Sequence, residues 1–263
     1  MASPLDRFAP PGLMSLAVSA RFKCQELGTA TAFVVTYRGS HYLVTNWHVA
    51  AGRNPDIGVV VSQSGGVPDR LAVLHHVAGK PGHWHYRTHA LYDDDDVPLW
   101  LEHPVHGRSV DVVALPLGPV KDIQLFPYDL HDLGPHIVFG PSDPVSIIGF
   151  PFALSGGGGL GVWVQGTLAT EPSIDYGDVP LLLVDSRTRE GQSGSPVVLY
   201  RTDGYVTEGG DIINNGVAAA RLVGVYSGRI NKESDLGRVW KISALVEILD
   251  AQHRGPLPGL ARS

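Results

Sequence analysis

The sequence predicts an all-β protein of two six-stranded antiparallel β-barrels, followed by a single helix near the C-terminus. The 263 residues contain 32 Gly and 20 Pro, an excess of turn formers that is typical of many short strands. Val, Thr and Tyr are concentrated in short runs that turn residues separate. Helical spacing of apolar residues is confined to one segment, which argues against regular alternation of strands and helices.

The predicted strands begin after residues 1–12, which contain three prolines and are interpreted as an N-terminal arm. Arg38-Gly39-Ser40 is expected to form a hairpin turn between the second and third strands. The midpoint of the chain divides it into a first barrel over residues 13–135 and a second barrel with the helix over residues 136–263. The predicted strands cover residues 13–20, 30–37, 41–45, 57–62, 71–76, 110–117, 145–150, 162–170, 181–184, 197–200, 218–226 and 238–242.

The terminal helix is predicted from four apolar residues, Ala244, Leu245, Ile248 and Leu249, which recur at helical spacing. Ser243 directly precedes them and is interpreted as the N-cap residue. No internal repeat or low-complexity linker divides the chain.

Composition and charge exclude several classes of partner. The net charge of -6 and the pI of about 6.0 argue against nucleic acid, because a phosphate-binding surface needs clustered Lys and Arg. Residues 13–18 are too short an apolar run for a signal peptide or a membrane span. The single cysteine, Cys24, has no internal disulfide partner and is expected to be buried and structural. We therefore expect a cytoplasmic protein with no membrane or nucleic-acid partner.

The sequence Gly191-Gln192-Ser193-Gly194 contains a candidate nucleophile. Glycines on both sides of Ser193 allow unusual backbone angles and a close approach to a substrate carbonyl. The N–H groups of Gly191 and Ser193 are therefore candidates for an oxyanion hole, while the hydroxyl of Ser193 attacks the carbonyl carbon. The motif taken alone is more typical of a surface turn rich in Gly and Ser.

His48 and Asp111 supply the other two groups that such a serine needs. His48 follows the strand-like run 42–45, which places an imidazole where a strand leaves the core. Asp111 lies between Val110 and Val112, where an ionised carboxylate is costly unless hydrogen bonds hold it. The imidazole N–H of His48 is a natural donor, and an acid in that place keeps the ring in the tautomer that accepts the serine proton.

Three segments, residues 45–49, 111–115 and 191–196, resemble the signature segments of chymotrypsin-like (trypsin-like) serine peptidases in their order along the chain. Asp111 follows His48 by 63 residues and precedes Ser193 by 82. The resemblance implies a cleft between two barrels and a serine endopeptidase that acts on protein or peptide substrates without a cofactor. The form Thr-Asn-x-His-Val without disulfides resembles bacterial, HtrA-like or "trypsin-2"-type catalytic domains, here expected without a PDZ domain.

Gln192 stands where many secreted members of that family have an aspartate that pairs with a new N-terminus after activation cleavage. A neutral amide forms no such ion pair. The sequence also has no matching processing site near its start. We therefore expect a catalytic domain that needs no N-terminal cleavage, with equal activity after removal of residues 1–12.

By the same resemblance, the pocket for the residue before the scissile bond is formed by residues 185–192, 226–229 and 236–239. The substrate-binding candidates are Arg187, Tyr226, Ser227, Gly228 and Arg229. An arginine that points inward, either Arg187 or Arg229, favours an acidic substrate side chain. The alternative is that these arginines are solvated or pair with Asp185 and Glu190.

Two further interpretations concern metals and other functions. Seven histidines lie between residues 75 and 106, but their spacing matches no compact zinc pattern, so no metal is expected. An α/β-hydrolase esterase is opposed by Ser195, which stands where Gly-x-Ser-x-Gly requires glycine, and by the order of the triad. A catalytically silent peptide-binding module remains the alternative. The sequence leaves the oligomeric state open.

Overall fold

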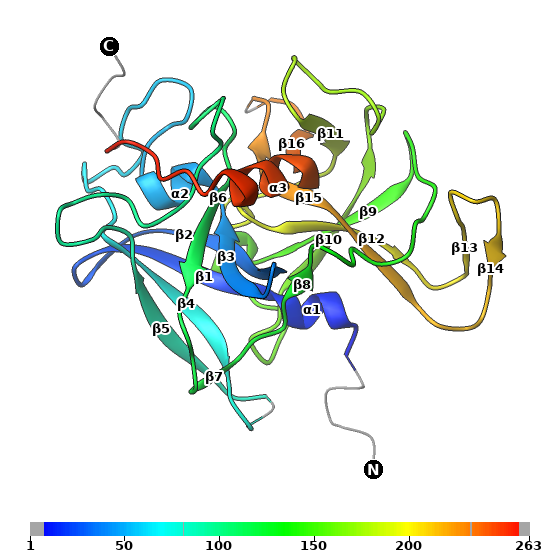
Figure 1. Cartoon of the computed structure of the whole chain (residues 1–263), viewed down its shortest axis with the longest axis horizontal. Helices are drawn as coiled ribbons and strands as arrows, with labels where there is room; N and C mark the ends of the chain where they lie inside the picture. The colour runs from blue at the N-terminus through cyan, green and yellow to red at the C-terminus, as the bar shows by residue number, and fades with distance from the viewer. Residues whose placement is uncertain (1–7, 81, 232, 258–263) are drawn as a thin grey trace.

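The computed structural model describes residues 8–80, 82–231 and 233–257. Strands dominate it, and they form two sheets that pack side by side with a C-terminal helix across them (Figure 1). The all-β class predicted from turn residues and short β-branched runs is therefore confirmed. Residues 1–7 of the predicted N-terminal arm lie outside the described residues.

The first sheet has the strand order β5-β4-β1-β2-β3-β6, with β7 beside β4 and β8 beside β2. Its strands are antiparallel except for the parallel pair β2 and β8. Their bounds are β1 (Ser15–Phe22), β2 (Gln25–Tyr37), β3 (Ser40–Thr45), β4 (Arg70–Val77), β5 (Trp84–Ala90), β6 (Val113–Leu117), β7 (Ile123–Gln124) and β8 (Tyr128–Asp129).

This sheet curls without closing through strand pairing between β5 and β6. The connecting residues 91–112 fill the gap, where Leu91 and Trp100 are fully buried and Leu101 makes an isolated bridge to Ala114. The connection contains Asp93-Asp94-Asp95-Asp96 and two prolines, which disfavour a strand. Side chains rather than a sixth ladder therefore complete the first lobe.

The second sheet is a closed six-stranded barrel in the order β10-β11-β16-β15-β12-β9. Apolar side chains from its strands fill the interior, among them Ile147, Val197 and Val239, all fully buried. The strand bounds are β9 (Pro144–Gly149), β10 (Val162–Leu168), β11 (Leu181–Asp185), β12 (Pro196–Arg201), β15 (Ala219–Arg229) and β16 (Leu236–Lys241). A two-stranded hairpin, β13 (Tyr205–Val206) with β14 (Ile212–Ile213), projects from one end (Figure 1).

The helices are α1 (Pro10–Met14), α2 (Trp47–Ala51), the 3-10 turn η2 (Pro151–Ala153) and α3 (Ile242–Ala251). The predicted terminal helix is confirmed, but Ser243 is not its N-cap. Lys241 holds that position without a side-chain cap, and the helix begins at Ile242 because strand β16 runs directly into it. Leu245 and Ile248 of α3 belong to an apolar cluster with Phe33 of the first sheet and Val198 of the second.

Three local predictions differ from the structure. Residues 57–62 form no strand, and the short stretch around Val60 makes a single bridge to Arg53. Leu13 lies in α1 rather than in a strand, because Pro10 and Pro11 begin a helical turn. Cys24 is exposed, since it lies in the two-residue turn between β1 and β2.

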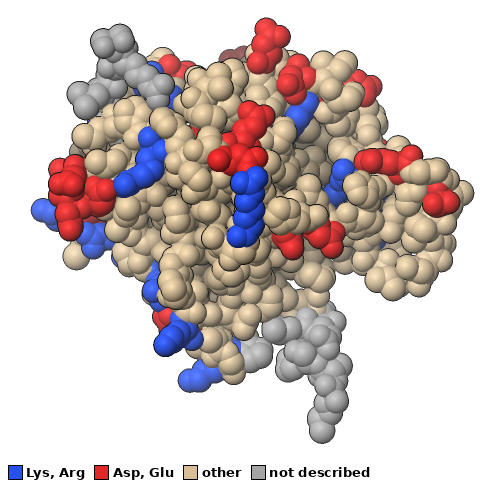
Figure 2. All heavy atoms as spheres, in the orientation of Figure 1, with Lys and Arg blue, Asp and Glu red and all other residues tan. Residues whose placement is uncertain are grey.

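The surface carries mixed charge. On the face drawn in Figure 2, Lys and Arg side chains lie scattered among Asp and Glu. No helix within the described ranges is long and apolar enough to cross a bilayer.

Candidate active site

His48 lies on α2, a five-residue helix that follows directly on the buried strand β3. Asn46 has extended backbone angles (φ -80°, ψ 152°), and the helix ends at Gly52 with φ 62°. Trp47 and Val49 are buried on either side of His48, whose own side chain is 23% exposed. The short helix therefore presents the imidazole at the surface of an otherwise apolar segment.

Asp111 is buried, with a side chain only 6% exposed, and faces His48. Its Oδ2 lies 2.7 Å from Nδ1 of His48, and its Oδ1 accepts the backbone N–H of His48 at 2.9 Å. The side-chain amide of Asn46 donates to the backbone carbonyl of Asp111 at 2.7 Å. Both carboxylate oxygens are thus hydrogen-bonded, as a buried charge requires.

This contact defines the state of the imidazole. An ionised carboxylate only accepts hydrogen bonds, so Nδ1 of His48 carries the proton and Nε2 keeps its lone pair. Burial lowers the pKa of His48, but the charge and the hydrogen bond of Asp111 outweigh it and leave that pKa above its ordinary value. The ring is therefore a stronger proton acceptor than a free histidine.

Ser193 lies in a loop whose glycines are required by close packing. Gly191 has φ 90°, and a Cβ added there would lie 2.2 Å from the carbonyl oxygen of Phe150. Gly194 has φ 84°, and its added Cβ would lie 2.1 Å from the carbonyl oxygen of Thr31. Any side chain at either position would overlap backbone atoms and adopt an unfavourable φ.

Backbone hydrogen bonds hold this loop from several directions. The N–H of Gly194 donates to Tyr226 at 2.9 Å, and Thr31 donates to the carbonyl of Ser193 at 2.8 Å. The buried side chain of Gln192 accepts the N–H of Arg189 at 2.8 Å. The position that carries an aspartate in many relatives of this motif thus anchors the loop here through a neutral amide.

Three groups in this loop are free to meet a substrate. Within the described part of the chain, no acceptor takes the N–H of Gly191 or of Ser193. The hydroxyl of half-buried Ser193 makes no hydrogen bond to His48 or to any other described residue. Contacts between a nucleophile and its base are often long in the absence of substrate.

A cavity of about 420 Å³ opens beside Ser193. Of the five predicted substrate-binding residues, Tyr226, Gly228 and Arg229 line it. Phe152, Thr188, Arg189 and Glu190 complete the lining. The buried hydroxyl of Tyr226 contacts that of Thr188.

Burial raises the pKa of Tyr226, and the Thr188 hydroxyl and the positive charge of Arg229 lower it in part. The charge of Arg229 therefore acts on the Tyr226 end of the cavity.

The other two predicted substrate-binding residues do not line this cavity. The side chain of Arg187 is 84% exposed and pairs with Asp235 at 3.7 Å, so it does not line the cavity. Ser227 also lies outside the lining, and its hydroxyl accepts the indole N–H of Trp240 at 3.1 Å. Ser227 lies at an irregularity of β15, where the register with β16 shifts between Tyr226 and Gly228.

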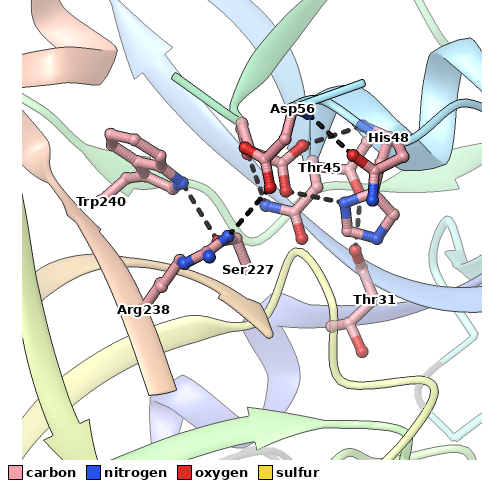
Figure 3. A network of polar contacts seen from close by, with 10 residues as sticks. Thr31, Thr45, His48, Asp56, Ser227, Arg238 and Trp240 are labelled. Carbon is pink, nitrogen blue, oxygen red and sulfur yellow. Dashed lines mark hydrogen bonds and ion pairs between the residues drawn. The ribbon is translucent and has the colours of Figure 1, made fainter. Parts of the chain in front are cut away.

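Figure 3 shows a network of polar contacts in which His48, Thr31, Thr45, Ser227 and Trp240 are labelled. Arg238 of β16 lies 3.9 Å from Asp56, which follows α2, so this pair links the two lobes beside the site. The hydroxyl of Thr45 donates to the carbonyl of Thr31 at 2.8 Å. Thr45 precedes His48 by three residues on the same segment.

His48 itself lines a second, smaller cavity of about 120 Å³. Apolar side chains provide most of its wall, and Leu27, Val49, Val61 and Pro68 are among them. The candidate site is therefore flanked by a polar cavity beside Ser193 and an apolar cavity beside His48.

Sequence reasoning missed Thr31, Asn46 and Phe152. Thr31 is a polar residue in the apolar run 30–35, on a strand buried on both faces. A polar residue within an apolar run was the sequence signal that could have indicated a role for Thr31. Asn46 lies inside the recognised motif around His48, but its contact to Asp111 joins residues far apart in sequence.

No three His, Cys, Asp or Glu residues in the described ranges are placed to hold one metal ion. In the histidine-rich segment, the Nε2 atoms of His75 and His89 lie 3.0 Å apart. That distance fits an ordinary hydrogen bond between two neutral rings.

Comparisons with known proteins identify the family of this chain. Residues 30–206 match the family model of the trypsin-like peptidase domain. No curated protein matches the sequence significantly. Among solved structures, the Rv3671c protease of M. tuberculosis in its active form is similar at a TM-score of 0.47 and 16% identity, over 94% of this chain and 83% of that one.

The thermostable serine protease AL20 of an extremophilic microorganism is similar at a TM-score of 0.52 and 10% identity, over 92% of this chain and 98% of that one. At this identity the likeness extends to the fold alone.

Proposed function

Because the chain belongs to the trypsin-like peptidase domain family, we propose that it is a serine endopeptidase with His48, Asp111 and Ser193 as its catalytic triad. The observation that carries the proposal is the 2.7 Å contact between Nδ1 of His48 and Oδ2 of Asp111. This contact leaves Nε2 of His48 as a proton acceptor. The segment that carries His48 is connected to the Ser193 loop through hydrogen bonds of Thr45 and Thr31.

In the proposed reaction, the hydroxyl oxygen of Ser193 attacks the carbonyl carbon of a peptide bond while Nε2 of His48 takes its proton. The carbonyl oxygen becomes an oxyanion, and the N–H groups of Gly191 and Ser193 donate to it. The imidazolium then gives its proton to the leaving amine, and an acyl ester on Ser193 remains. Water, activated by His48, hydrolyses that ester and restores the serine.

Asp111 acts through His48. Its carboxylate holds the Nδ1–H tautomer and stabilises the imidazolium that forms in each half of the reaction. The same interaction with Asp111 raises the pKa of His48 in the free protein. No cofactor is required for any of these steps.

We further propose that the cavity beside Ser193 favours an acidic side chain before the scissile bond. Two arginines, Arg189 and Arg229, line this cavity with a single carboxylate, that of Glu190. Guanidinium groups bind carboxylates through charge-assisted hydrogen bonds. Arg187, with its side chain in solvent, has no part in this preference.

The test of the proposed function is hydrolysis of a fluorogenic peptide library by the purified chain. Ser193→Ala and His48→Ala are each expected to lower kcat by about 10⁴-fold or more. Ser195→Ala is the matched control, because it removes a neighbouring buried hydroxyl that has no hydrogen-bond partner in the described structure. Peptide binding without hydrolysis would favour the peptide-binding module instead.

A further inference from the structure

Thr31 is a fully buried threonine on β2. It pairs with Ala17 of β1 on one edge of the strand, and on the other edge it lies just past the end of the pairing with β3. The pairing of β2 with β3 ends at Phe33 and Val44, and the chain leaves β3 after Thr45 to form α2. The N–H and C=O groups of Thr31 lie just past that last pair. They are therefore available to segments other than the sheet.

Thr31 directs its polar groups at the segment that carries Ser193. Its N–H donates to the carbonyl of Ser193 at 2.8 Å, and its hydroxyl donates to the carbonyl of Gly191 at 2.8 Å. The same hydroxyl oxygen accepts the N–H of Phe150 at 3.1 Å. A hydroxyl has one hydrogen and two lone pairs, so its donor capacity is fully used.

These contacts lie on both sides of the Ser193 N–H and directly after the Gly191 N–H, the two groups proposed for the oxyanion. The carbonyl of Gly191 belongs to the peptide group that lies between those of the two donors. The carbonyl of Ser193 belongs to the peptide group that follows the second donor. Since each peptide group is planar and rigid, Thr31 fixes the backbone on both sides of the Ser193 N–H.

Thr31 also contacts the segment that leads to His48. Its carbonyl accepts the hydroxyl of Thr45 at 2.8 Å, as Figure 3 shows. The same carbonyl oxygen would lie 2.1 Å from a Cβ on Gly194, so Gly194 packs directly on it. One residue of the first lobe thus contacts both halves of the candidate site.

We propose that Thr31 is a positioning residue, which holds the Gly191–Ser193 backbone in the orientation that presents its N–H groups to the oxyanion. This inference rests on the proposed function. The role requires the hydroxyl, because valine has the same shape but would leave the carbonyl of Gly191 and the N–H of Phe150 buried without their partner.

The experiment compares Thr31→Val with Thr31→Ser and with the control Thr36→Val. Thr36 lies on the same strand, and its side chain makes no hydrogen bond to any described residue. Each variant is measured for kcat and KM on the best peptide of the library, and for affinity to a peptide boronic acid and to a product peptide. Far-UV circular dichroism and the melting temperature establish folding.

We expect Thr31→Val to lower kcat by about 100-fold or more, which is the effect of losing one oxyanion donor. KM and product affinity should change by less than about threefold, while boronic acid affinity falls in parallel with kcat. Thr31→Ser should restore most of kcat, and Thr36→Val should leave it unchanged. If Thr31→Val does not fold, Thr31→Cys keeps the volume with a weaker donor and should give the same split to a smaller extent.

A folded Thr31→Val or Thr31→Cys variant that keeps wild-type kcat would overturn the positioning role. So would a loss of kcat accompanied by an equal loss of product affinity. If Ser193→Ala abolishes hydrolysis but Thr31→Val does not affect it, the proposed function stands and this inference alone fails. If the unmodified chain hydrolyses no peptide, both fail together.

Discussion

The two sides of the candidate cleft are held in place by different parts of the chain. On the first lobe, side chains determine the geometry, because Asp111 holds both the ring and the backbone of His48. On the second lobe, the backbone of the Ser193 loop determines the geometry. Gly191 and Gly194 lie in close contact with neighbouring carbonyls, and Thr31 donates hydrogen bonds to the carbonyls of Gly191 and Ser193.

This difference separates two kinds of sensitivity. A substitution on the His48 side changes the protonation or orientation of one group and leaves the fold intact. A substitution in the Ser193 loop moves several backbone groups together, because the proposed nucleophile and both proposed oxyanion donors share one short segment. Substitutions on the His48 side are therefore expected to lower activity by changing proton transfer. Substitutions in the Ser193 loop are expected to lower it by displacing backbone groups.

The largest effect that tests this comparison is that of Asp111→Asn. The amide keeps the shape but can donate to Nδ1 of His48, which favours the wrong tautomer and lowers kcat by about 10⁴-fold. The melting temperature should change little compared with that loss. Steady-state kinetics and differential scanning calorimetry measure both, and a variant with near-normal kcat would remove Asp111 from the triad.

Gly194→Ala tests the other side. Its Cβ would lie 2.1 Å from the Thr31 carbonyl at a φ of 84°, so we expect a loss of about 2 kcal/mol or more in the free energy of unfolding. Activity should fall with it, because the loop carries Ser193.

Gly118→Ala is the control for this substitution. Its Cβ would meet no atom within 4 Å, and a change below about 0.5 kcal/mol is expected. Urea unfolding gives both values, and equal stabilities of the two variants would contradict the close packing of the loop.

The cavity gives a smaller effect, on specificity. Arg229→Ala should lower kcat/KM for peptides with Glu before the scissile bond by about tenfold to hundredfold, as expected for a charged hydrogen bond. Peptides with Leu there should be little affected. Arg187→Ala is the control, because that side chain is 84% exposed. A wild-type preference for Lys or Arg would refute the acidic preference.

The pH profile provides the smallest effect and concerns only the His48 side. His48 must be neutral to accept a proton, so kcat/KM falls as the pH drops through the pKa of this residue. Because that pKa is raised, the acidic limb should lie above the ordinary histidine value of 6.5. A limb below that value would contradict the contribution of Asp111.

The sequence predicted His48, Asp111 and Ser193 as a triad because each lies in a short motif whose residue types follow from the chemistry. The structure brings His48 and Asp111 into contact, and the triad itself stays a prediction. It predicted the closed second barrel because regular β-branched runs form it. The open edge of the first sheet was harder to predict, since residues 91–112 complete it by side-chain packing. Cys24 was placed wrongly because burial statistics for cysteine ignore a local turn.

Short motifs could not predict the contacts between segments that lie far apart in the sequence. Thr31 meets Gly191 across 160 residues, and only the packing of the two lobes brings them together. Arg187 and Ser227 were assigned to the cavity by resemblance, yet the local direction of each side chain takes it elsewhere. Side-chain direction at a single position depends on the exact register of its strand or loop.

The site of a fluorophosphonate adduct tests most directly whether Ser193 is the nucleophile. Tandem mass spectrometry of the digested, labelled protein determines this site. An activated serine next to an oxyanion hole reacts with this probe, while an ordinary hydroxyl does not. We expect a single adduct on Ser193, lost in Ser193→Ala and kept in Ser195→Ala. An unlabelled wild-type protein, or an adduct on another serine, would contradict it.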